Sequence, residues 1–209
     1  MTAALREIAI AGPDAFSLRG VARRAGVSAP AVYRHFKDKE DLLAAVAAEC
    51  SDRIGALMRE AVAHAPDDPL AQFRATGIAY VQFAVAHPAH FRALSVPGLF
   101  ERTPVEQLER QVAWQANQRA ALARAQAEGK IAALPLDDIL LAASSLVHGL
   151  AQLIVEGKLG KVSEARAREL AITVTGVTVL GFLPREGSFE DPLAATLPKS
   201  PKKPPRRSA

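Results

Sequence analysis

The chain has 209 residues, of which 49% are apolar and only 5% aromatic, and its formal net charge is +4. This length suffices for one or two hydrophobic cores. Alanine and leucine dominate over β-branched runs, and only residues 171–180 alternate as a strand would, so we expect an all-α protein. A single cysteine, Cys50, excludes an intrachain disulfide. No basic, hydrophobic leader opens the chain, which predicts a cytoplasmic protein.

Residues 17–39 (SLRGVARRAGVSAPAVYRHFKDK) predict two short helices joined by a glycine turn. Ser17 and Ser28 each precede a short run of mixed residues, where a hydroxyl can accept from the first free amides of a helix. Gly26 lies where a tight turn requires positive φ. We expect Val27 to be buried beneath this corner.

The small and apolar residues of this segment predict how the two helices pack. Ala22 permits a close crossing, and Val32 with Phe36 supplies the apolar face. The other side chains point outward and combine hydrogen-bond donors, cations and small apolar groups, a set that suits the major groove of DNA. The expected DNA-facing residues are Ser17, Arg19, Ser28, Ala29, Pro30, Ala31, Tyr33, Arg34, His35 and Lys39.

The segment resembles the DNA-binding domain of TetR-family regulators, over about residues 2–48 and with a matching ending at Tyr33, His35, Phe36 and Lys39. The resemblance implies that Tyr33, His35 and Lys39 bind phosphates and that Arg19 reaches a guanine edge. These roles suit the chemistry of the side chains. The small residues 29–31 would contact thymine methyl groups. The alternative is a helical corner of an unrelated all-α protein.

Asp38 is placed to cap a long helix that runs to about Ala65 and joins the DNA-binding segment to the rest of the chain. Its apolar side chains are expected to face inward: Leu42, Leu43, Val46, Ile54, Leu57 and Met58. A ligand that tilts this helix would change the distance between two DNA-binding segments in a dimer. Cys50 lies on the same helix, where a buried apolar role and a redox-sensing role are both open.

Prolines and capping residues divide the remaining chain into five further helices. We expect them at about residues 70–86, 87–94, 103–128, 135–155 and 163–184, with a loop containing Pro97 and Gly98 and a Thr103–Pro104 cap before the third. With three helices in the DNA-binding segment and the long connecting helix, the expected total is about nine.

The last two long helices, at residues 139–155 and 171–183, are apolar nearly all round and must be covered on more than one side. We therefore expect a homodimer through these two helices, which the TetR resemblance also implies. Three glycines would allow their close approach: Gly149, Gly176 and Gly181. A membrane span at 139–155 is the alternative, but this stretch is near the lower length limit and contains four polar residues, so we expect no membrane insertion.

The second half of the chain resembles the TetR-type regulatory domain named for a Trp-His-Gly signature, through residues 80–91 (YVQFAVAHPAHF) and the pair His148–Gly149. The resemblance implies a pocket for an unknown small-molecule effector. By residue type, its candidate lining is Tyr80, His87, Phe91, Trp114, Gln118 and His148, although each of these also suits an ordinary helical core.

Other chemistry has weaker support in the sequence. His87 and His90 are spaced to share a helix face, but no neighbouring cysteine or carboxylate completes a metal site. We find no glycine-rich phosphate loop, no nucleophile turn and no acid–base pair, so we expect no metal, no cofactor and no enzymatic activity.

Residues 185–209, rich in Pro, Ser, Lys and Arg, predict a disordered tail that is either inert or adds nonspecific attraction to DNA. We divide the chain into a helix-turn-helix domain (1–48), a regulatory, ligand-binding and dimerisation domain (49–184) and this tail. The predicted function is transcriptional repression, with a small molecule releasing the dimer from a palindromic operator in double-stranded DNA. The alternative is an effector-independent architectural or partner-recruiting DNA-binding protein.

Overall fold

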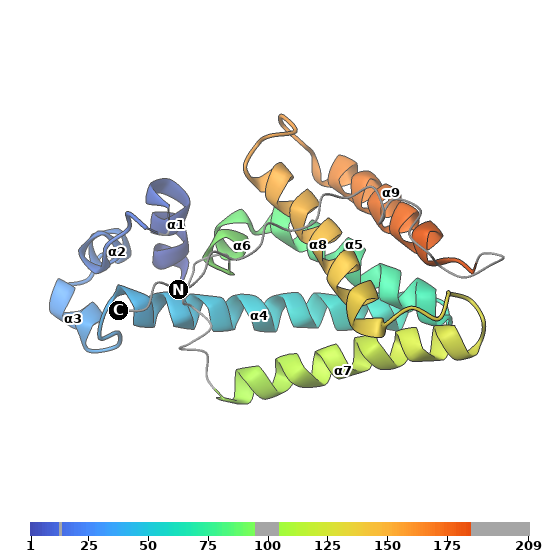
Figure 1. Ribbon diagram of the computed structural model, residues 1–209. Helices are drawn as coiled ribbons and strands as arrows, with labels where there is room; N and C mark the ends of the chain where they lie inside the picture. Colours follow the sequence, from blue (N-terminus) through green and yellow to red (C-terminus); the bar gives the residue numbers. More distant parts are fainter. Residues whose placement is uncertain (13, 95–104, 185–209) are drawn as a thin grey trace, which may run out of the picture.

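The computed structural model describes residues 1–12, 14–94 and 105–184, which form nine α-helices and no strand. The helices are α1 (Thr2–Ala11), α2 (Leu18–Ala25), α3 (Ala29–Tyr33), α4 (Lys39–His64), α5 (Pro69–Ala86), α6 (Pro88–Leu94), α7 (Val105–Ala127), α8 (Leu136–Val155) and α9 (Glu164–Phe182) (Figure 1). The all-α prediction is confirmed, and residues 171–180 lie within α9. The predicted loop at Pro97 and Gly98, the Thr103–Pro104 cap and the tail lie outside the described residues.

Short-range signals set the ends of α2 and α3. Ser17 accepts a hydrogen bond from the Gly20 amide (3.0 Å), and Gly26 ends α2 in the left-handed conformation with φ 69°. Ser28 precedes α3 as predicted, but its hydroxyl makes no capping bond. Pro30 lacks an amide hydrogen, and the Ala31 amide already donates to the Ser28 carbonyl, so the two nearest donors are absent or used.

Carboxylates and a serine cap three of the longer helices in the same way. The acceptors and donors are Asp38 with the Asp41 amide at α4, Asp68 with the Leu70 and Ala71 amides at α5, and Ser163 with the Arg166 amide at α9. Each side chain satisfies amides that a helix start leaves unpaired. The predicted helix starts at these three positions are correct.

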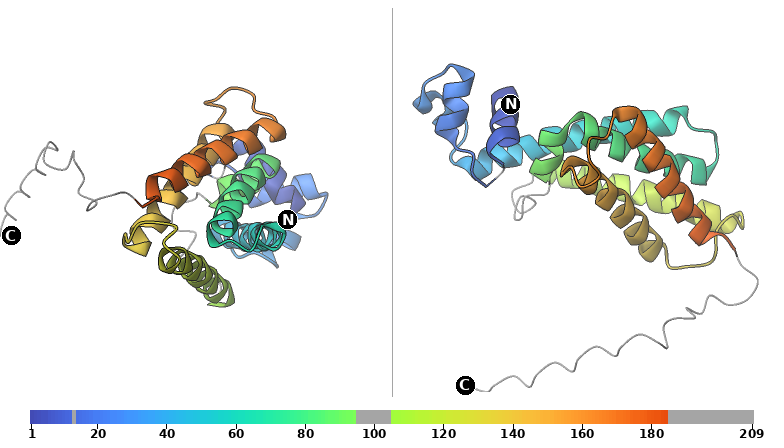
Figure 2. Two further views of the ribbon diagram at one scale, coloured as in Figure 1. Left: turned by 90° about the vertical axis from the view of Figure 1, so that its right-hand side faces the viewer. Right: turned by 90° about the horizontal axis from the view of Figure 1, so that it is seen from above.

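The helices form a small head (α1–α3) and a larger body (α5–α9) joined along α4 (Figure 1). The head gathers at the N-terminal end of α4, and the body lies along the rest. Within the body α5 is central, since it contacts α4, α6, α7, α8 and α9. The helices α7 and α9 lie on opposite sides of α5 (Figure 2).

Two expectations about burial are wrong. Val27 is 47% exposed, because the core beneath the glycine turn is filled by Ala22 and Val32. Leu57 is 38% exposed, because the buried stripe of α4 advances in steps of four through Ile54 and Met58 and leaves position 57 beside it.

Candidate functional site

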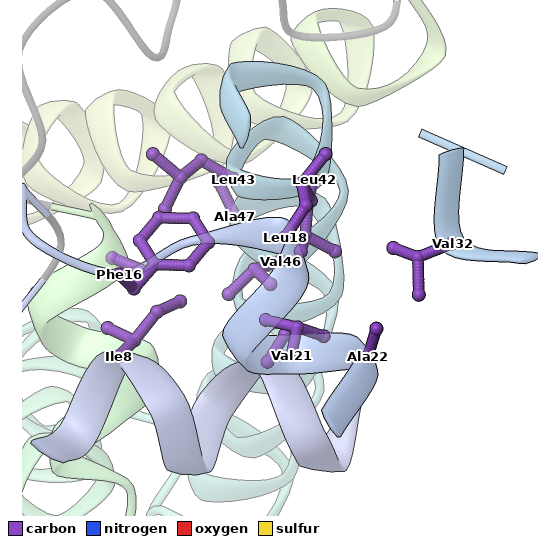
Figure 3. Packing of buried hydrophobic residues seen from close by; sticks show 12 residues of the cluster. Ile8, Phe16, Leu18, Val21, Ala22, Val32, Leu42, Leu43, Val46 and Ala47 are labelled. Carbon is purple, nitrogen blue, oxygen red and sulfur yellow. The ribbon is translucent and has the colours of Figure 1, made fainter. Parts of the chain in front are cut away.

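The head core holds α2 and α3 in a fixed relation. It combines apolar side chains from α1, the following turn, α2, α3 and α4: Ile8, Phe16, Leu18, Val21, Ala22, Val32, Leu42, Leu43, Val46 and Ala47 (Figure 3). Ala22 lies opposite Val32 at the crossing of α2 and α3, as its small size predicts. Full burial of a side chain such as Ile8 or Leu42 stabilises the head by roughly 1.5–3 kcal/mol each.

The outer side of α2 and α3 carries most of the predicted DNA-facing residues. The exposed members are Ser17, Arg19, Ser28, Pro30, Tyr33, Arg34 and His35, and Ala31 is half-buried. Ala29 was predicted to face outward, but it is half-buried and packs against the head core on the same side of α3 as Val32.

Lys39 ties the first turn of α4 to the loop before α2. Its Nζ donates to the Asp14 carbonyl (3.0 Å) and lies 6.0 Å from the centre of the Phe16 ring. An ammonium has three donors, so two remain for a phosphate in the role that the resemblance implies.

Glu7 and Arg24 form a further tie between α1 and α2. The Arg24 Nε donates to Glu7 Oε2 (2.8 Å), and the glutamate side chain is largely buried. Gly20 leaves the space for this carboxylate, since a Cβ there would overlap Glu7 Oε1. Arg24 is therefore engaged in a structural ion pair, whereas Arg19, at the opposite end of α2, is exposed and makes no ion pair among the described residues.

The body contains a pocket of about 940 Å³ between α5, α7, α8 and α9. Four of the six predicted lining residues border it: Tyr80, Trp114, Gln118 and His148. The Tyr80 hydroxyl and His148 Nδ1 lie 2.8 Å apart. Burial raises the pKa of Tyr80 to about 12, so the phenol keeps its proton at neutral pH and can donate in this hydrogen bond.

Phe91 and His87 are not on the lining of this pocket. Phe91 is fully buried behind it, with its ring 5.4 Å from that of His148 and 6.0 Å from that of Tyr80. His87 is half-buried and packs on Phe83, with ring centres 5.0 Å apart. His87 follows the end of α5, and Phe91 lies on α6. The resemblance of the YVQFAVAHPAHF stretch had suggested that both residues line the pocket.

The structure also adds a pocket residue that sequence reasoning missed. Arg74 of α5 borders the pocket and donates to Thr175 and to the Ile172 carbonyl on α9. Its partners are about a hundred residues away in sequence, so its role could not be inferred from spacing. The available signal was that Arg74 is the one charged residue in the sequence 69–86.

A carboxylate that the sequence did not predict, that of Glu49, lies near the pair His87 and His90. The Nε2 of His90 lies 3.8 Å from Glu49 Oε1 on α4 and is buried without a hydrogen bond, while the His87 ring centre is 5.5 Å from that of His90. Within the described ranges, no three His, Cys, Asp or Glu side chains are arranged to hold a metal ion. The contact joins α4 to α6.

A His90→Leu variant is expected to be less sensitive to acid than the parent protein. Burial lowers the pKa of His90, the charge of Glu49 opposes this, and His87 and Arg53 add to it. Between its unfolded pKa of about 6.5 and its lower folded pKa, only the unfolded state binds the proton, so stability falls as pH drops, by at most about 1.4 kcal/mol per pH unit. Thermal unfolding across this range measures the slope, and identical slopes in both proteins would contradict the assignment.

Cys50 behaves as a buried apolar residue. It is fully buried among Ile54 and Phe83, and this burial raises the pKa of its thiol above the ordinary value, with Glu49 adding to the effect. A reactive thiol needs a lowered pKa and access to solvent, so the redox-sensing alternative loses support.

Family comparisons match both parts of the chain. The family described as "Bacterial regulatory proteins, tetR family" matches residues 1–46, and the one described as "Tetracyclin repressor-like, C-terminal domain" matches residues 73–177, half of the chain. The chain belongs to the TetR family. TetR-family members are DNA-binding transcription regulators rather than enzymes. The chain that carries the exposed side of α2 and α3 is therefore a DNA-binding regulator. The Trp-His-Gly subtype stays a prediction.

Individual relatives agree with this family. The chain is 41% identical over 71 residues to the HTH-type transcriptional regulator AcrR of Shigella flexneri, a match that covers 34% of this chain and only 33% of that protein. A solved protein of unknown function from Rhodococcus sp. RHA1 is 29% identical, with a TM-score of 0.69 over 88% of this chain and 93% of its own. The TetR-family regulator PfmR from Thermus thermophilus shares the fold, with 21% identity and a TM-score of 0.64 over 87% and 94% of the two chains.

Proposed function

We propose that this TetR-family protein is a ligand-responsive repressor that acts as a cytoplasmic homodimer on a palindromic operator. The main support is the combination of an exposed helix-turn-helix face with a pocket of about 940 Å³ in the same chain. A dimer would place two copies of α3 in successive major grooves, about 34 Å apart. The ligand must favour the dimer state that fits DNA poorly, because equal affinity for both states shifts nothing.

Exposed apolar side chains on α8 and α9 support the dimer. They are Leu146, Leu153, Val177 and Leu180, which we call the apolar face. A Cβ added at Gly149 or Gly181 would meet no atom within 4 Å, so both glycines leave open surface for a second chain. Among the described helices α8 alone is long and apolar enough to span a membrane, yet it packs on α5, α7 and α9. Coverage by a partner subunit explains its remaining apolar surface.

Helix α6 provides the route from the pocket to the head. Its residue Phe91 packs behind Tyr80 and His148, which border the pocket, while its residue Ala93 is buried in the head core. The same helix contacts α1 and α4. A ligand that displaces His148 would move Phe91 and α6, and with α6 the orientation of the head.

A gel shift with DNA flanking the protein's own gene tests the proposal. A competitor-resistant band at dimer stoichiometry, released by a compound that also stabilises the protein, supports it; saturation at a hundred times the dissociation constant gives roughly 2.7 kcal/mol. Specific binding without release by any compound in a broad effector screen would favour the effector-independent alternative.

An Arg19→Ala variant is expected to lose discrimination at one base pair of the operator. An exposed guanidinium can fork onto guanine O6 and N7, and losing such a contact costs about 1–3 kcal/mol on the specific site. Competition against operators altered one base pair at a time measures the loss. A uniform loss across all sequences would assign Arg19 to the backbone instead.

A Lys39→Ala variant is expected to weaken binding to all sequences alike. Removal of one phosphate contact per subunit lowers the slope of log affinity against log salt by about one per contact. Because Lys39 also bonds Asp14, Lys39→Gln serves as a neutral control that keeps a donor for the carbonyl. An unchanged salt slope in both variants would limit Lys39 to its structural contact.

A further inference from the structure

The pocket contains a cation that no acidic side chain balances within the described part of the chain. Arg119 and Asp137, two other charged residues on its lining, contact each other at the exposed rim. Arg74 donates from Nε to Thr175 Oγ1 (3.1 Å) and from Nη2 to the Ile172 carbonyl (2.7 Å). Both acceptors are neutral, so the charge of Arg74 stays uncompensated among these residues.

The Arg74 guanidinium is also held in place by the backbone of α9. A Cβ at Gly176 would lie 3.1 Å from its Nη2, so the glycine provides the space that the guanidinium fills. The second terminal nitrogen, Nη1, has no acceptor among the described residues. A guanidinium fixed through one edge keeps its other donors aimed and loses little freedom when a ligand binds them.

The rest of the lining sets the other half of the ligand. Phe73, Trp114, Leu140 and Val147 form apolar walls, and the volume is within the range of small-molecule sites. An ion pair is stronger beside such walls than in water. We propose that the effector is an apolar molecule with a single anionic group, such as a carboxylate or sulfonate, and that Arg74 binds the anion. This inference rests on the proposed function, since it names the ligand class of the same pocket.

Two fluorescent probes with the same ring system test the inference without DNA. Anilinonaphthalene sulfonate carries one anionic group, and phenylnaphthylamine lacks it. The wild-type dimer is expected to bind the sulfonate at least about tenfold more tightly, the lower end for a charge-assisted hydrogen bond. Arg74→Gln should remove this preference while binding of the neutral probe stays within about twofold. Arg168→Gln, the same change at an exposed α9 arginine outside the pocket, should keep the preference.

Equal affinity of the wild-type protein for the two probes would overturn the inference, as would a preference that survives Arg74→Gln. If Arg74→Gln does not fold, Arg74→Lys decides, because it keeps the charge without the fork and should retain a reduced preference; an unchanged or reversed preference counts against Arg74. Operator release is scored separately by gel shift. If binding of the sulfonate depends on Arg74 but no probe releases the operator, the inference stands and ligand-controlled repression is refuted. If only the neutral probe releases the operator, ligand-controlled repression stands and the inference is refuted.

Discussion

A Val177→Glu variant is expected to be a monomer that binds its operator at least about a hundredfold more weakly. Val177 lies on the apolar face and is 63% exposed in the single chain, so the change leaves the fold of the subunit intact. In the proposed dimer each subunit would bury a carboxylate without a partner charge, which costs about 3–5 kcal/mol. That energy corresponds to at least two orders of magnitude in dimer affinity. Light scattering at micromolar concentration should give the chain mass of 22.2 kDa in place of twice that value.

Val105→Glu is the matched control for this experiment. Val105 is 66% exposed, nearly the same as Val177, but it begins α7, away from the apolar face. A carboxylate in the first turn of a helix is mildly favourable. This variant should stay dimeric and bind the operator normally. Dimers of both variants would refute an interface through α9, and monomers of both would show that the effect of the charge is not local.

The ends of the helices follow from neighbouring residues, which is why the sequence predicts them well. Ser17, Asp38, Asp68 and Ser163 cap helices through amides two or three residues away, and Gly26 adopts the left-handed turn that its lack of a Cβ allows. Such interactions depend on few other parts of the fold. The fold of the head could be predicted for a similar reason, because its residue pattern is confined to one short segment.

Whether a side chain is buried or exposed depends on which distant helix packs against it. The sequence was less informative about this property. Val27 and Leu57 are apolar yet exposed, and Ala29 turns inward because the three-residue step to Val32 puts both on one side of α3. The contact between His90 and Glu49 joins two helices far apart in the chain. For the same reason, the pocket-lining residues of α7 and α8 could be proposed only from their residue type and not from their position in the sequence.

A Phe91→Ala variant is expected to lower the free energy of unfolding by about 3–5 kcal/mol. Phe91 is fully buried among Ala84, Ala151 and Tyr80, and the two alanines are too small to fill the vacated space. Such a loss is a large part of the roughly 5–15 kcal/mol typical of a folded domain. Urea unfolding followed by circular dichroism measures it. A loss below about 1 kcal/mol would show that α6 is loosely held.

The milder Phe91→Leu change separates stability from signalling. It keeps most of the side-chain volume, so it should cost less than about 1.5 kcal/mol and leave operator binding unchanged. It removes the ring that packs against His148, 5.4 Å away, while Ala93 keeps α6 in the head core. If α6 carries the motion from the pocket, the effector should still bind Phe91→Leu but release the operator several-fold less effectively. Full release would place the connection elsewhere, and the direct contact between α4 and α5 would be the next route to test.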